Sequence, residues 1–253
     1  MTWKTNVFRA INRVLNHFSL EISRYSDLSL QAAFERFVQR PVSIASVIDV
    51  GASDGRWSAR VMRYYPRAHY LLVEANVHFE PKLREFVGRH QNASYALVAA
   101  GPREGIANFH APSDPLGGLA SEQPIEHAFA VPMTTIDRLS VDYNLPAPYL
   151  IKLDTHGFEV PILAGAREAL KRANMLIIEV YNFRFTAESV LFYHLCQHLE
   201  ALGFRPVDLI EPVHRPFDAA LWQFDLVFVP ADRPEFSVNQ FAAAHHPSGQ
   251  HHI

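Results

Sequence analysis

Residues 47–55 read Val-Ile-Asp-Val-Gly-Ala-Ser-Asp-Gly, an apolar run that breaks into a glycine-containing turn before a helical pattern opening near Trp57. Glycine adopts backbone conformations that other residues avoid, so Gly51 and Gly55 let the chain approach a ligand closely. The free amides at the start of the following helix favour an anionic group beside the turn. This stretch predicts the first strand, turn and helix of an α/β sheet, with a ligand at the turn.

Outward from this stretch, short apolar runs alternate with helical patterns. We expect strands at residues 46–50, 70–73, 95–99, 149–153, 175–180, 204–210 and 224–229, and helices at residues 57–65, 79–90, 158–172 and 187–202. This alternation predicts a doubly wound, mostly parallel α/β sheet with helices on both faces. The last two strands have no clear helix between them, which indicates an antiparallel hairpin at one edge. Residues 101–132 are expected to be rich in loops.

The two ends of the chain differ in texture from this alternating region. Residues 1–40 carry two amphipathic helical patterns and are expected to form a helical extension that caps a main domain at residues 41–230. Residues 231–253 are polar, and we expect a flexible tail there. Trp3, Arg9 and Arg13 on the first helix suit a membrane surface, so peripheral membrane contact is an alternative role for that helix.

Composition excludes several classes of function. The chain has 253 residues, 49% of them apolar, which is enough for a sizeable core. Its 23 basic and 26 acidic side chains give a formal net charge of −3, so no global positive field attracts nucleic acid. The single cysteine, Cys196, fits a reducing compartment. No apolar run is long enough to span a membrane, so we expect a cytoplasmic protein without an integral membrane segment. Nothing in the sequence indicates the oligomeric state.

An acidic residue, Glu74, closes the second expected strand about 20 residues beyond the glycine turn, where a carboxylate can accept hydrogen bonds from two ribose hydroxyls. The turn has only two glycines, whereas a dinucleotide pyrophosphate favours Gly-x-Gly-x-x-Gly, so a nicotinamide dehydrogenase is disfavoured. Asp49 and Asp54 would repel a pyrophosphate but can accept hydrogen bonds from an ammonium group. These features favour S-adenosylmethionine as the cofactor. The competing interpretation is an ordinary turn in which the two aspartates cap the helix.

The residues expected around this cofactor come from the glycine turn, the ends of the neighbouring strands and a later acidic residue. They are Asp49, Gly51, Ala52, Ser53, Gly55, Trp57, Glu74, Ala75, Asn76, Ala99 and Asp154.

A second motif, residues 151–159, reads Ile-Lys-Leu-Asp-Thr-His-Gly-Phe-Glu and also runs from a strand into a helix. Ligands of open α/β sheets bind at the carboxyl ends of the strands, so Asp154 and His156 should face the same crevice as Gly51 and Glu74. With these pieces in place, the chain resembles the FkbM-type methyltransferases. The resemblance covers residues 45–230 and rests on residues 47–55, 74, 134–139, 151–159, 165–166 and 176–180.

The resemblance implies a seven-stranded sheet, S-adenosylmethionine as methyl donor and a hydroxyl acceptor on a sugar, a glycan or a secondary metabolite. Many members of the family carry an acidic residue where this chain has His156. An alcohol acceptor needs a base, and an imidazole, with an ordinary pKa of about 6.5, is suited to that role. We expect His156 to be the base, with Asp154 orienting its ring along an extended segment. The competing interpretation is a turn histidine bonded to backbone.

Glu179 should lie at the carboxyl end of the strand at residues 175–180 and is a third candidate for the catalytic site. It can bind an acceptor hydroxyl or help to hold a metal, and the alternative is an ion pair with Lys152 or Arg184. No dedicated metal site is expected. Two other functions stay open: N-methylation of a peptide or amine, and a non-catalytic module that only binds the nucleoside.

Overall fold

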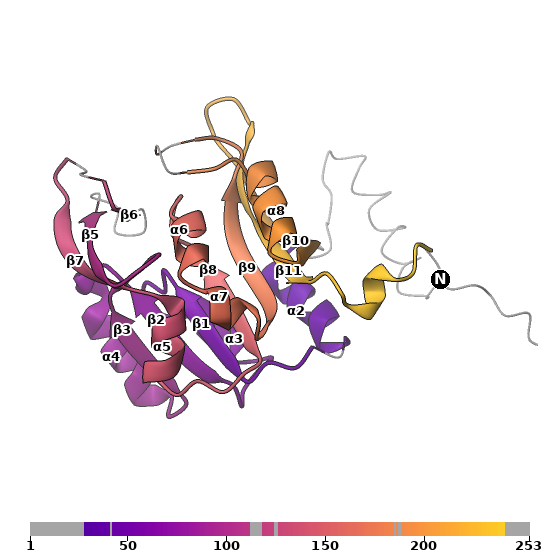
Figure 1. Ribbon diagram of the computed structural model, residues 1–253, viewed down its shortest axis with the longest axis horizontal. Coiled ribbons are helices and arrows are strands. Elements are labelled where there is room, and N and C mark those ends of the chain that lie inside the picture. The colour runs from indigo at the N-terminus through magenta and orange to yellow at the C-terminus, as the bar shows by residue number, and fades with distance from the viewer. Residues whose placement is uncertain are drawn as a thin grey trace, which may run out of the picture.

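The computed structural model describes residues 28–40, 42–111, 118–123, 126–184, 186 and 189–240 (Figure 1). The first expected helix, with Trp3, Arg9 and Arg13, and residues 241–253 of the expected tail lie outside the described residues. Within them, no helix is long and apolar enough to cross a membrane.

A seven-stranded sheet forms the centre of the molecule, in the order β10-β11-β9-β8-β1-β2-β3. Its strands are β1 (Ser46–Val50), β2 (His69–Glu74), β3 (Ala93–Leu97), β8 (Tyr149–Leu153), β9 (Ala173–Tyr181), β10 (Phe204–His214) and β11 (Leu221–Pro230). The first five are mutually parallel, whereas β11 pairs antiparallel with both β9 and β10. The expected doubly wound sheet and its antiparallel edge hairpin are therefore confirmed.

Helices cover both faces of this sheet (Figure 1). One side has α2 (Leu30–Val38), α3 (Arg56–Val61), η2 (Val77–Phe79) and α4 (Glu80–Arg89), and the other has α5 (Ile136–Asp142), α6 (Glu159–Ala164), α7 (Arg167–Leu170) and α8 (Phe192–Ala201). Successive side chains of a strand point to opposite faces. Val47 of β1 accordingly packs with α2, α3 and α4, while Ile48 packs with the second set. A short helix, η4 (Pro234–Phe236), follows β11.

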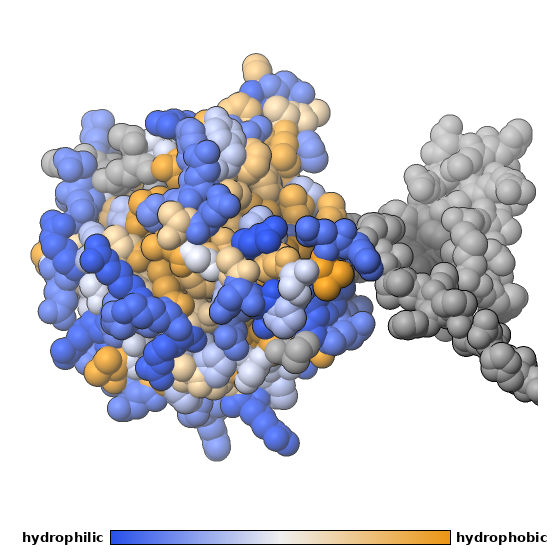
Figure 2. Space-filling view, turned by 45° about the vertical axis from the view of Figure 1, so that its right-hand side comes forward, coloured by the Kyte–Doolittle hydropathy of each residue, from blue (hydrophilic) through white to orange (hydrophobic). Residues whose placement is uncertain are grey.

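The connection between β10 and β11 projects from the body of the molecule at the top of Figure 1. Hydrophobic side chains appear on this projection and in the middle of the adjoining face in Figure 2. Phe217, in the connection, is 88% exposed.

Residues 101–132, expected to be rich in loops, also contribute strands to a second sheet that the sequence did not predict. This sheet has the order β4-β7-β5-β6, with strands β4 (Ala99–Ala100), β5 (Gly105–His110), β6 (Leu119–Ser121) and β7 (Phe129–Thr134). In β5, Ala107 and Phe109 are buried while Ile106 is 63% exposed. The alternation is short, and the glycines and prolines around it hide the strand signal.

The helix expected at residues 158–172 is instead two helices, α6 and α7, separated at Gly165. A Cβ at Gly165 would lie 2.1 Å from the carbonyl oxygen of Gly101, so this close crossing requires glycine. Asp137 Oδ1 accepts hydrogen bonds from the backbone amides of Glu168 and Ala169 and caps α7. Two of the segments on which the family resemblance rests, residues 134–139 and 165–166, therefore hold helices in contact and do not face a ligand.

Candidate active site

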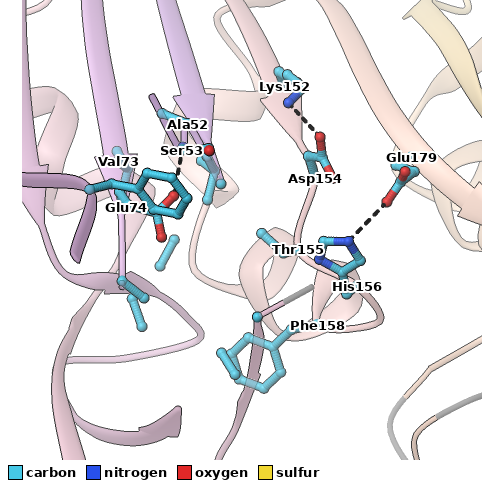
Figure 3. Close-up of a pocket in the computed structure, with 18 of the residues that line it drawn as sticks. Ala52, Ser53, Val73, Glu74, Lys152, Asp154, Thr155, His156, Phe158 and Glu179 are labelled. Atoms are coloured by element: carbon cyan, nitrogen blue, oxygen red, sulfur yellow. Dashed lines mark hydrogen bonds and ion pairs between the residues drawn. The ribbon is translucent and has the colours of Figure 1, made fainter. Parts of the chain in front are cut away.

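A cavity of about 400 Å³ lies at the carboxyl ends of β1, β2, β8 and β9, the size of a small-molecule site (Figure 3). The glycine turn, Glu74 and the second motif all contribute to its wall. The residues that line it are Val50, Gly51, Ala52, Ser53, Asp54, Arg56, Trp57, Arg60, Val73, Glu74, Ala75, Phe79, Val98, Ala99, Ala100, Phe109, Gly118, Ala120, Lys152, Asp154, Thr155, His156, Phe158, Ile162, Glu179 and Gln223.

The glycine turn is required by packing within the protein. Gly51 and Gly55 have φ angles of +77° and +80°, in the left-handed region that favours glycine. A Cβ at Gly51 would lie 2.0 Å from the carbonyl oxygen of Asp154, and one at Gly55 would lie 2.8 Å from the Phe86 ring. The turn thus brings β1 against the second motif, and only Gly51 of the two lines the cavity.

Glu74, at the end of β2, is held by the backbone. Its Oε2 accepts a hydrogen bond of 2.7 Å from the Ser53 amide, and its Oε1 accepts one of 2.8 Å from the Asn76 amide (Figure 3). Burial raises the pKa of this carboxyl group, and the two amide hydrogen bonds oppose that rise. A carboxylate has about four lone-pair positions, so acceptor capacity remains for two ribose hydroxyls.

The polar atoms around Glu74 fit a nucleoside. Among the described residues, the Ser53 hydroxyl and the Trp57 indole nitrogen are buried and have no hydrogen-bond partner. Both residues line the cavity. Because buried polar groups are nearly always bonded, these two call for a polar ligand. Small side chains at Ala52, Ala75 and Ala99 leave space beside them.

Three of the residues expected around the cofactor do not line the cavity: Asp49, Gly55 and Asn76. Asp49 is 0% exposed, and its Oδ2 accepts a 2.7 Å hydrogen bond from the Ser58 hydroxyl. The side-chain oxygen of Asn76 accepts from the His78 amide and caps η2. These three residues lie behind the wall of the cavity. Asp49 is bonded to α3, Gly55 directly precedes α3, and Asn76 precedes η2.

Lys152 of β8 joins two carboxylates. Its Nζ lies 2.8 Å from Asp154 Oδ2 and 3.6 Å from Asp49 Oδ1, and it sits 5.2 Å from the centre of the Trp57 ring. Burial works against an ionised lysine, but the two carboxylates outweigh it and raise its pKa. Burial likewise works against the Asp154 carboxylate, and Lys152 and His156 outweigh it and lower the pKa of Asp154.

His156 faces the cavity but not in the way expected. Its φ is +54°, so residues 154–156 are not an extended segment, and Asp154 pairs with Lys152 instead of orienting the imidazole. The following loop is held by Glu159, whose Oε1 accepts hydrogen bonds from the Gly157 amide and the Thr155 hydroxyl. The turn at Gly157 thus decides where the ring points.

Glu179 of β9 is the acidic group that approaches the imidazole: its Oε2 lies 3.9 Å from His156 Nε2 (Figure 3). It accepts hydrogen bonds from the Tyr181 hydroxyl and the Gln223 amide. Burial raises the pKa of Glu179, and the negative charge of Asp154 adds to that rise. Burial lowers the pKa of His156, so its ring is neutral at pH 7.

Asp154, His156 and Glu179 each present a ligand atom within 4.8 Å of the others, a spacing at which a cation can bind. Among the described residues, they form the one group of three potential metal-ligating side chains that lie this close together. Lys152 already neutralises Asp154, and Glu179 is bonded to Tyr181 and Gln223.

Sequence reasoning missed several residues of the wall. Phe109 is in β5, Gly118 directly precedes β6, Ala120 is in β6, and Gln223 is in β11. The signal that could have found Phe109 is the alternation within residues 105–110. Nothing local marks Gln223, because it reaches the site only through the pairing of β11 with β9.

The chain is similar to several solved structures, of which three are described. The methyltransferase FkbM from Methylobacillus flagellatus KT is 20% identical, with a TM-score of 0.50, over 73% of this chain and 43% of that one. This chain therefore spans less than half of that protein's length. A fibrillarin pre-rRNA processing protein from Methanococcus jannaschii is 14% identical, with a TM-score of 0.49, over 83% and 78% of the two chains.

A 1,6-didemethyltoxoflavin-N1-methyltransferase from Burkholderia thailandensis, solved with 1,6-didemethyltoxoflavin and S-adenosylhomocysteine, is 15% identical. Its TM-score is 0.46, over 90% of this chain and 89% of that one. No curated protein matches the chain.

The sequence matches the methyltransferase FkbM domain over residues 49–206, which is more than half of the chain. The matched region contains the glycine turn, Glu74 and the second motif, on which the cavity is built. The protein therefore belongs to the methyltransferase FkbM family.

Proposed function

We propose that this enzyme transfers the methyl group of S-adenosylmethionine to a hydroxyl oxygen of an uncharged sugar, glycan or secondary metabolite. The observation that carries the proposal is the position of a half-buried imidazole, His156, in the same cavity as Glu74 and the glycine turn. A hydroxyl acceptor needs such a group, because an alcohol must lose its proton as the new bond forms.

The donor is proposed to bind across β1 and β2. Glu74 accepts hydrogen bonds from the ribose hydroxyls, and Ser53 and Trp57 supply polar atoms beside it. Ala99 lies near the adenine ring. Asp154 accepts hydrogen bonds from the amino group of the methionine end. When bound, S-adenosylmethionine supplies a methyl group activated by its positively charged sulfur.

The acceptor is proposed to bind between His156 and Glu179. His156 takes the hydroxyl proton, and the nearby Glu179 carboxyl group stabilises the imidazolium that results. Phe109 and Ala120 of the second sheet cover this part of the cavity and keep water away from the reacting atoms. Excluding water prevents loss of the methyl group to hydrolysis.

Charge supports an uncharged acceptor. Each cationic side chain among the described lining residues already has a carboxylate partner: Lys152 has Asp154, Arg56 has Asp54 and Arg60 has Glu211. An acidic substrate or a nucleic-acid backbone would find no unpaired cation there.

The lone cysteine and the absence of a described spanning helix are consistent with the cytoplasmic location that we propose.

A second candidate is methylation of an amine. Two carboxyl groups, Asp154 and Glu179, face the cavity and would attract a cationic substrate. The bound ammonium must first lose its proton to water, after which no base is needed during transfer, because an uncharged amine is already a good nucleophile.

The proposal is tested by release of S-adenosylhomocysteine from S-adenosylmethionine in the presence of matched acceptors: neutral glycosides, amino sugars and sugar acids. We expect release with a neutral hydroxyl acceptor, and its loss in His156→Ala. Turnover with an amine alone, unaffected by His156→Ala, would favour N-methylation. Donor binding without turnover by any acceptor class would favour a binding module.

A further inference from the structure

Lys152 stands in an unusual place for a lysine. It is the fourth residue of β8, next to Asp49 across the strand pair, and its side chain is 5% exposed. A buried ammonium is costly unless it is paired, and here two carboxylates pair with it. One of them is in the interior, since Asp49 is 0% exposed, whereas the other, Asp154, is 32% exposed and lines the cavity.

The two contacts of Lys152 are not equivalent. Asp49 is also bonded to Ser58, so its position is fixed by α3 as well. Asp154 Oδ2 accepts a 2.8 Å hydrogen bond from Lys152 Nζ, and the Asp154 carboxyl group also shares a hydrogen bond with Glu179. Asp154 follows the last residue of β8, and Figure 3 shows the Lys152 side chain above it, joined to its carboxylate by the dashed line.

We propose that Lys152 is a positioning residue for the amino-acid end of the methyl donor. It holds Asp154 ionised and directed so that its cavity-facing oxygen accepts hydrogen bonds from the donor's ammonium group. The inference rests on the proposed placement of the donor. Lys152 binds Asp154 through Oδ2, which leaves the other carboxylate oxygen to accept a hydrogen bond from the ammonium group.

The test compares two ligands that differ only at that end. S-adenosylhomocysteine carries the amino-acid end, whereas 5′-methylthioadenosine keeps the adenosine and the sulfur but lacks it. Calorimetry of the wild-type protein, Lys152→Met, Lys152→Arg and the double variant Asp49→Asn/Lys152→Met measures both affinities. The double variant removes the lysine together with the buried charge that would otherwise be left unpaired, and thermal unfolding checks that each protein is folded.

We expect Lys152→Met and the double variant to lose about tenfold or more in affinity for S-adenosylhomocysteine, the effect of a lost charge-assisted contact. Their affinity for 5′-methylthioadenosine should stay within about twofold, and Lys152→Arg should restore most of the loss.

Wild-type affinity for S-adenosylhomocysteine in the double variant would overturn the inference, because Lys152 would then only neutralise Asp49. An equal loss of both ligands in the folded double variant would overturn it too, since the role would be structural. Equal affinity of the wild-type protein for 5′-methylthioadenosine and S-adenosylhomocysteine would overturn the inference, because the amino-acid end would then contribute nothing to binding. The proposed nucleoside site would be unaffected by that result. No binding of either ligand by the wild-type protein would overturn the donor assignment as well.

Discussion

The two ends of the cavity are built by different means. At the nucleoside part of the donor end, the key groups are fixed by backbone: Glu74 is held by two amides, and Gly51 by its φ and its contact with the Asp154 carbonyl. At the acceptor end, Glu179 is instead held by two side chains, those of Tyr181 and Gln223. The donor end therefore follows from the fold, whereas the acceptor end depends on individual side chains that can change without disturbing the sheet.

This contrast predicts that the two ends can be damaged separately. Replacing His156 by alanine should lower turnover by about 10²- to 10⁴-fold, the usual contribution of a general base. Affinity for S-adenosylhomocysteine should stay within about twofold. Initial rates and calorimetry on the same preparation measure the two effects. A variant that loses donor affinity in proportion to its rate would contradict the division.

Gly51→Ala should damage both ends at once, because the new Cβ would strike the Asp154 carbonyl and the backbone is left-handed there. We expect a loss of about 2–3 kcal/mol in the free energy of unfolding, together with loss of donor binding. Gly203→Ala is the matched control: its φ is +84°, but no atom lies within 4 Å of the added Cβ. Equal losses of stability in the two variants would mean that the contact with Asp154 contributes nothing.

Glu74→Gln should weaken donor binding by about 1–3 kcal/mol and leave the acceptor end intact. The amide keeps one acceptor oxygen but cannot serve two ribose hydroxyls and two backbone amides together. Titration with S-adenosylhomocysteine gives the affinity, and Glu85→Gln on the exposed face of α4 is the control. An unchanged affinity would remove Glu74 from the donor site.

The smallest expected effect is on the pH profile. Because burial lowers the pKa of His156, its neutral form persists below the ordinary imidazole value of about 6.5. With a hydroxyl acceptor and saturating donor, the rate should be level from about pH 7 to 8 and fall only below about pH 6.5. A rate that instead keeps rising above pH 8 would indicate an amine acceptor losing its proton.

The same contrast explains what the sequence could predict. The strands, the edge hairpin and Glu74 could be predicted, because each is marked by a pattern that extends over only a few neighbouring residues. The second sheet and Gln223 depend on pairing between distant segments. The orientation of Asp154 was predicted wrongly because the left-handed backbone at His156 arises from the Gly157 turn and Glu159, not from a strand pattern.

The most direct test of the account is a crystal structure of the protein with S-adenosylhomocysteine bound. We predict both ribose hydroxyls on the Glu74 carboxylate, the amino group on Asp154 and the sulfur facing the space between His156 and Glu179. A ligand bound elsewhere, or with its sulfur turned away from His156, would contradict it.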